Sequence, residues 1–104
     1  MIELGPADAG STRDVRPGEE VVVRIPENRT TGYRWMIESA EPVLRMTEDR
    51  YAAPGGGPGA AGERILRFTA ASPGDIQLRL ASRRPWESGA APADTFAVTL
   101  HVAA

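Results

Sequence analysis

The sequence predicts an all-β domain, an immunoglobulin-like β-sandwich of about seven strands. Several short segments alternate apolar and polar residues, and helical spacing is nowhere sustained. Clusters of Gly, Pro, Ser and Asp separate these segments at regular intervals. One sheet of such strands would leave an apolar face in water, so two sheets must pack together. The length of 104 residues suits one domain, and we expect a single domain over residues 1–104.

The expected strands differ in how clearly they alternate. In residues 33–38, alternation places Tyr33, Trp35 and Ile37 inward, and Trp35 is expected to be the core tryptophan common in such sandwiches. Residues 42–51 and 63–70 alternate less regularly, and Leu66 and Phe68 are the inward residues of the second of these segments. A short edge strand at the start of the chain completes the count. In chain order the expected strands cover residues 1–4, 19–25, 33–38, 42–51, 63–70, 75–80 and 95–102.

Three connections differ from ordinary tight turns, namely residues 26–32, 52–62 and 83–94. If successive strands run alternately up and down, these are the second, fourth and sixth connections and lie at one end of the sandwich. Sandwich domains commonly bind partners through loops clustered at one end. We therefore expect a binding surface formed by these three loops, called the loop rim below.

Composition excludes several classes of function. The net charge is −2, and all 12 basic residues are arginines spread along the chain, so we expect no nucleic-acid partner. The chain has no Cys and therefore no disulfide or thiolate ligand. No apolar run approaches the length of a membrane helix, so no membrane partner is expected. The opening residues do not resemble a signal peptide, which predicts a cytoplasmic protein if the chain is full length and an exported one if a leader was removed.

The titratable residues do not form a pattern typical of an enzyme. The one histidine, His101, alternates with inward-facing Leu100 and Val102, so it should point to solvent away from the loop rim. A catalytic triad or a zinc site would need further partners that the sequence does not supply. The glycine run at 55–59 lacks the Lys-Ser/Thr ending of a phosphate-binding loop. We expect no enzymatic activity, no cofactor and no metal.

Trp86 leaves two interpretations open. It follows Pro85 just beyond a strand, and Arg and Trp are side chains that often anchor protein interfaces. Alternatively, Trp86 folds back to cap the open end of the sandwich, with Arg84 stacking on its ring. The sequence favours neither interpretation over the other.

Taken together, the three loops resemble a known family. The stretch "NRTTGYRW", a glycine-rich stretch about 20 residues later and "RPW" about 20 residues further are similar to the motifs of the chagasin family, inhibitors of papain-like cysteine peptidases. The resemblance extends roughly from Glu19 to Val102. It implies an immunoglobulin-like fold and a reversible, competitive inhibitor that inserts three loops into the active-site cleft.

The resemblance also implies roles for individual residues. Thr30 and Thr31 would cover the catalytic cysteine and histidine, with Thr30 nearer the cysteine, while Gly32 would allow close backbone approach and Tyr33 would anchor the loop base. The glycine-rich loop would lie along the cleft, and Trp86 would cover its primed side. The residues so assigned to peptidase binding are Asn28, Arg29, Thr30, Thr31, Gly32, Tyr33, Gly55, Gly56, Gly57, Gly59, Arg84, Pro85 and Trp86.

Arg29 departs from the family pattern, which usually has proline at this position. Proline would pre-set φ, so an arginine should leave the loop more mobile, at a cost of order 0.4–1 kcal/mol on ordering. Alternatively, Arg29 contacts an acidic residue of a partner. The alternative function is a non-inhibitory binding module for a protein or carbohydrate, using Trp86 and Tyr51 as platforms. In either case we expect a monomer.

Overall fold

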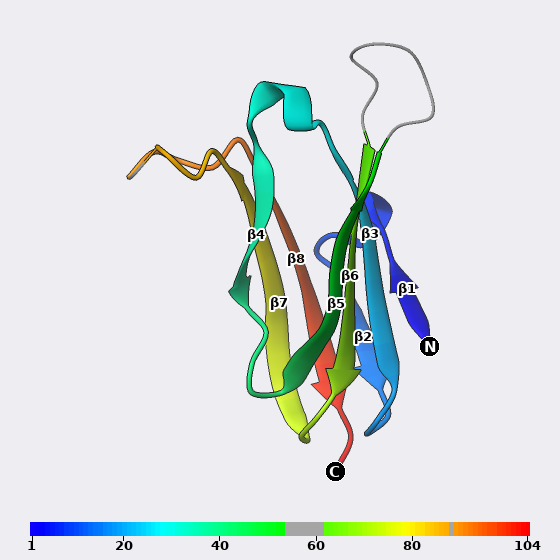
Figure 1. Cartoon of the computed structure of the whole chain (residues 1–104). Helices are drawn as coiled ribbons and strands as arrows, with labels where there is room; N and C mark the ends of the chain where they lie inside the picture. Colours follow the sequence, from blue (N-terminus) through cyan, green and yellow to red (C-terminus); the bar gives the residue numbers. More distant parts are fainter. Residues whose placement is uncertain (54–61, 88) are drawn as a thin grey trace.

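Two four-stranded β-sheets pack face to face in the computed structural model, which describes residues 1–53, 62–87 and 89–104 (Figure 1). The first sheet contains, in spatial order, β1 (Ile2–Leu4), β3 (Glu20–Glu27), β6 (Gly62–Ala70) and β5 (Leu44–Ala52). The second contains β2 (Thr12–Val15), β8 (Asp94–Val102), β7 (Gly74–Arg83) and β4 (Arg34–Ser39). Two single-turn 3₁₀ helices, η1 (Pro6–Asp8) and η2 (Arg29–Thr31), lie in the connections.

The core between the sheets is built by the alternating residues of the strands. Leu66 and Phe68 on β6 are fully buried, as predicted, and Trp35 on β4 is a core tryptophan. Because every second side chain of a strand faces the same side, the alternating strands β3, β6, β7 and β8 each contribute a regular set of apolar groups to this layer. The larger members are Ile2, Leu4, Val15, Val21, Val23, Ile25, Trp35, Leu44, Leu66, Phe68, Leu78, Leu80, Phe96, Val98, Leu100 and Val102. The predicted all-β sandwich is therefore confirmed.

The strand count differs from the prediction, because the described residues form eight strands and not about seven. The additional strand is β2, which pairs in parallel with the end of β8. Of its four residues only Val15 is buried, so this segment shows no apolar alternation that would predict a strand. The three unusual connections are consequently the third, fifth and seventh. Adding one strand before all of them preserves the alternation, so the β3–β4 and β7–β8 connections still share one end.

Pairing registers show how the strands meet at the loop rim. Glu27 at the end of β3 lies opposite Gly62 at the start of β6 in the first sheet. In the second sheet, Arg34 at the start of β4 lies opposite Arg83 at the end of β7. Figure 1 shows the turn between β3 and β4 and the connection between β7 and β8 at the same end of the molecule. The predicted clustering of these two connections is confirmed.

Candidate functional site

The β3–β4 connection is a compact turn built around η2. The Thr31 N–H donates to the Asn28 carbonyl at 3.4 Å, and the Gly32 N–H donates to the Arg29 carbonyl at 3.2 Å. The Thr31 hydroxyl also donates to the Asn28 carbonyl, at 2.8 Å. Gly32 has φ of +84°, in the left-handed region that glycine adopts without strain. The Thr31 hydroxyl and Gly32 thus shape the turn itself.

Trp86 lies on the surface of the loop rim beside this turn. Trp86 is 69% exposed, and the far edge of its indole ring packs against Gly32. A Cβ at Gly32 would collide with that ring, so glycine is required both for the turn and for the contact. Trp86 does not cap the open end of the sandwich. The structure therefore favours the surface interpretation that the sequence left open.

Arg84 joins the third loop to the first. Its Nε donates to the Thr31 carbonyl at 3.1 Å, and its guanidinium lies 4.5 Å from the centroid of the Tyr33 ring. Arg84 therefore stacks on Tyr33, and the proposed stacking on Trp86 was wrong. Tyr33, expected on the inner face, precedes β4 and is only half-buried, because its ring supports Arg84 at the rim.

Arg29 is held by groups of its own chain. Its Nε donates to Glu27 Oε1 at 2.9 Å, and its guanidinium lies 4.1 Å from the centroid of the Tyr51 ring. The acidic residue expected on a partner is thus present within the chain. Because Arg29 covers one face of Tyr51, that ring is not a free platform, and the alternative binding module loses one of its two aromatic surfaces.

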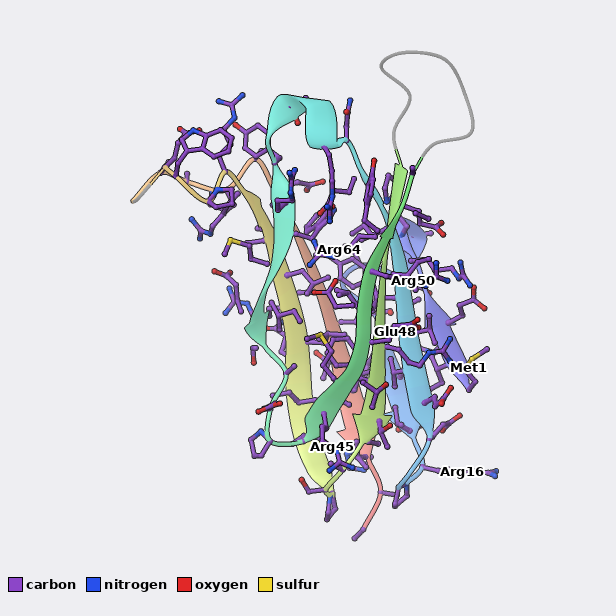
Figure 2. All side chains as sticks on the ribbon, in the orientation of Figure 1. Met1, Arg16, Arg45, Glu48, Arg50 and Arg64 are labelled. Carbon is purple, nitrogen blue, oxygen red and sulfur yellow. The ribbon has the colours of Figure 1, made fainter. Side chains whose placement is uncertain are left out.

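A buried ionic cluster lies beneath the turn, and its centre is Glu27, whose side chain is 2% exposed. Besides Arg29, the Glu27 carboxylate accepts a hydrogen bond from the Trp35 N–H at 2.7 Å and one from Arg64 Nη1 at 2.9 Å. Arg64, labelled in Figure 2 between β4 and β5, also donates to the Trp35 carbonyl at 3.0 Å. The cluster therefore links β3 and β6 of one sheet to β4 of the other, directly below the rim.

Arg64 has a second carboxylate partner, Asp49 on β5. Its Nε and Nη2 donate to the two oxygens of Asp49 at 2.5 and 2.8 Å, the paired geometry that suits guanidinium and carboxylate groups. These hydrogen bonds lower the pKa of Asp49 and raise that of Arg64. Asp49 thereby fixes Arg64 in the orientation that serves Glu27.

Sequence reasoning missed Glu27 because it was assigned to the loop. The signal was present, since Glu27 continues the inward-facing series Val21, Val23 and Ile25 at a spacing of two. A carboxylate on the inner face of a strand is rarely buried without partners, which would have pointed to a nearby arginine.

The structure brings together many of the residues that the resemblance assigned to peptidase binding. Those on or beside the η2 turn and the third loop are Asn28, Arg29, Thr31, Gly32, Tyr33, Arg84, Pro85 and Trp86. The backbone of Thr30 is part of the η2 turn. The predicted residues of the glycine-rich loop, Gly55, Gly56, Gly57 and Gly59, lie outside the described residues.

The one histidine lies far from this surface. His101 is exposed near the opposite end of β8, where it pairs with Asp75, and this hydrogen bond raises the pKa of the imidazole. Within residues 1–53, 62–87 and 89–104, His, Asp and Glu side chains form no group of three or more arranged to hold a metal ion. The described parts of the chain also include no helix with the length and apolarity needed to cross a membrane.

Comparison with known proteins identifies the family. The model of the chagasin family, described as peptidase inhibitor I42, matches residues 14–100. This protein belongs to the chagasin family of peptidase inhibitors. Chagasin from Trypanosoma cruzi is 30% identical over 100 residues, which cover 90% of this chain and 91% of chagasin. Membership confirms the resemblance seen in the sequence, and it confirms that the protein is an inhibitor and not an enzyme.

Solved structures agree on the fold. The cysteine protease inhibitor EhICP2 from Entamoeba histolytica superposes with a TM-score of 0.89 at 21% identity, over 97% of this chain and 94% of that protein. The inhibitor PbICP-C, solved in complex with falcipain-2, gives a TM-score of 0.72 at 15% identity, over 98% of this chain and 99% of that one. At such low identities these two similarities establish the sandwich architecture of this chain.

Proposed function

We propose that this protein is a reversible, competitive inhibitor of papain-like cysteine peptidases that inserts its loop rim into their active-site cleft. Family membership supports the class of target, and PbICP-C, which shares the fold, was solved bound to falcipain-2. The observation that carries the proposal is the placement of Trp86. A large aromatic side chain is exposed at the rim and held next to the Thr31–Gly32 turn, which is the arrangement expected of an interface anchor.

The shape of the turn explains how it could enter a cleft without being cut. A peptidase cleaves a segment that lies extended across its catalytic cysteine. Residues Arg29–Thr31 are instead coiled into η2, and the amides of Thr31 and Gly32 are bonded back to carbonyls within the turn. Gly32 has no side chain, so the backbone can approach a partner closely. In the proposal Thr30 lies nearest the catalytic cysteine, with Thr31 beside it.

Trp86 would supply most of the contact energy on the primed side of the cleft. Its ring loses freedom at only two side-chain torsions when bound, and Gly32 already supports one edge. Arg84 fixes the position of the third loop through the Thr31 carbonyl. The second contact of the proposal, by Gly55, Gly56, Gly57 and Gly59, concerns residues outside those described.

Titration of papain or a cathepsin L-type peptidase against a fluorogenic peptide tests this proposal. Residual activity is followed at several substrate concentrations, and the inhibitor is checked for cleavage by mass spectrometry. We expect the apparent inhibition constant to rise linearly with substrate concentration while the chain stays intact. Absence of inhibition of both peptidases at micromolar concentration, or steady cleavage of the chain, would refute the proposal.

A further inference from the structure

We infer that Arg29 is a positioning residue, which holds the η2 turn in its binding conformation by clamping it to Tyr51 on β5 and to buried Glu27. This inference rests on the proposed function, because it concerns how the turn is prepared for the cleft. It differs from the expectation drawn from the sequence, where an arginine at this position should leave the loop more mobile.

The clamp uses both the charge and the planar shape of the guanidinium. Along one edge, Nε donates to Glu27 Oε1 at 2.9 Å; across its face, the group lies 4.1 Å from the Tyr51 ring centroid. Stacking and directed hydrogen bonding at once are characteristic of arginine and not of lysine. Both partners belong to strands of the first sheet, so the turn is fixed to a rigid element.

Glu27 is a fixed point and not a mobile acceptor. Its other oxygen, Oε2, accepts from the Trp35 N–H at 2.7 Å and from Arg64 Nη1 at 2.9 Å, and the side chain is almost fully buried. Charge-assisted bonds of this kind are short and directional. The Arg29 side chain therefore meets a carboxylate whose position is already set by β4 and β6.

A second arginine holds the same turn from the other sheet. Arg84 follows β7, donates to the Thr31 carbonyl at 3.1 Å and stacks on Tyr33. The η2 turn is thus held on both sides, by Arg29 toward β5 and by Arg84 toward β7. Removal of the Arg29 or the Arg84 side chain should raise the population of turn conformations that do not fit the active-site cleft.

This role makes a kinetic prediction that a direct contact would not make. If the turn is ordered in only a fraction of molecules, the association rate falls to that fraction of its full value while the bound complex is unchanged. A side chain that touches the peptidase instead contributes mainly to the dissociation rate. From the usual strength of an exposed cation–π contact, we expect a roughly fivefold loss of ordered turn when Arg29 is truncated.

The experiment compares Arg29→Ala, Arg29→Pro and Tyr51→Leu with the parent protein. Proline is informative because residue 29 is the first residue of η2, where proline fixes φ without the guanidinium. Arg50→Ala is the matched control, since Arg50 lies on β5 but pairs with Glu48. Two quantities are measured: water exchange of the Thr31 and Gly32 amides by NMR in the free protein, and association and dissociation rates with papain by stopped flow.

We expect Arg29→Ala and Tyr51→Leu each to speed exchange of both amides and to slow association roughly fivefold, with dissociation changed less than twofold. The double variant Arg29→Ala/Tyr51→Leu should be no worse than Arg29→Ala alone, Arg29→Pro should restore association, and the Arg50→Ala control should match the parent. Unchanged amide exchange in Arg29→Ala would overturn the inference. So would faster dissociation in Arg29→Ala and Arg29→Pro alike, because that pattern indicates direct contact with the peptidase. If the parent does not inhibit at all, the proposed function fails, whereas amide exchange still decides whether the clamp exists.

Discussion

Replacement of Trp86 by alanine should abolish most of the inhibition while leaving the fold intact. A tryptophan side chain buries roughly 150–250 Å² when fully covered. With 69% of the residue exposed in the free protein, about 100–170 Å² is left for a peptidase to cover. At about 25 cal/mol per Å² this area corresponds to roughly 2.5–4 kcal/mol. We expect Trp86→Ala to cost about 2–4 kcal/mol of binding free energy, a rise in the inhibition constant of roughly 30-fold or more.

The assay pairs the inhibition constant with the free energy of unfolding in urea. Because the described contact of the Trp86 ring is with the surface turn at Gly32, its removal should change the unfolding free energy by less than about 0.5 kcal/mol. Met36→Ala provides a matched control, since Met36 is 43% exposed on β4 and belongs to neither the turn nor the third loop. An inhibition constant within threefold of the parent, in a folded Trp86→Ala variant, would show that Trp86 is not an anchor.

Three further predictions concern the turn and the cluster below it. Glu27→Gln should lower the free energy of unfolding in urea by about 1–3 kcal/mol, since Arg64 and Arg29 lose a buried charged partner. Its control is Glu3→Gln, which removes an exposed partner of Arg24 and should change the free energy of unfolding by less than about 0.5 kcal/mol. Gly32→Ala should strain the turn by about 1–2 kcal/mol and displace Trp86, which a tenfold or larger rise in the inhibition constant would report. Asp49→Asn should destabilise the protein at pH 7, but because the pKa of Asp49 is lowered in the fold, the difference in unfolding free energy from the parent should shrink as the pH falls below about 4. A pH-independent difference would contradict the role of its ion pair with Arg64.

Much of the sandwich could be predicted because several of its strands carry a two-residue period. Residues 95–102 alternate without exception, and β8 occupies Asp94–Val102. β2 escaped prediction because its single core residue, Val15, gives no period to recognise, and its pairing with β8 is decided by contacts distant in sequence. Strands at the edge of a sheet that bury one side chain are specified by their neighbours more than by their own residues.

The sequence predicts which loops carry the candidate site, but not the contacts that the structure shows within it. The order of motifs identified the loops, yet the partners of both rim arginines depend on the distance between strands that the sequence separates by many residues. Arg29 and Tyr51 are 22 positions apart, and Arg84 and Tyr33 are 51 positions apart. One of the two interpretations left open by the sequence therefore paired Arg84 with its neighbour Trp86, and a more mobile loop was expected where the fold supplies Glu27 and Tyr51 to Arg29.

In the proposed complex the loop rim covers the catalytic cysteine of a papain-like peptidase, so that cysteine should be protected from alkylation. Papain is mixed with a small excess of this protein, iodoacetamide is added, and the rate of carbamidomethylation at the active-site cysteine is followed by mass spectrometry. A pre-formed complex is verified by size-exclusion chromatography. We expect alkylation to slow in proportion to the fraction of papain bound, and its rate to recover with Trp86→Ala. Alkylation at the rate of free papain within a demonstrated complex would contradict the proposed mode of binding.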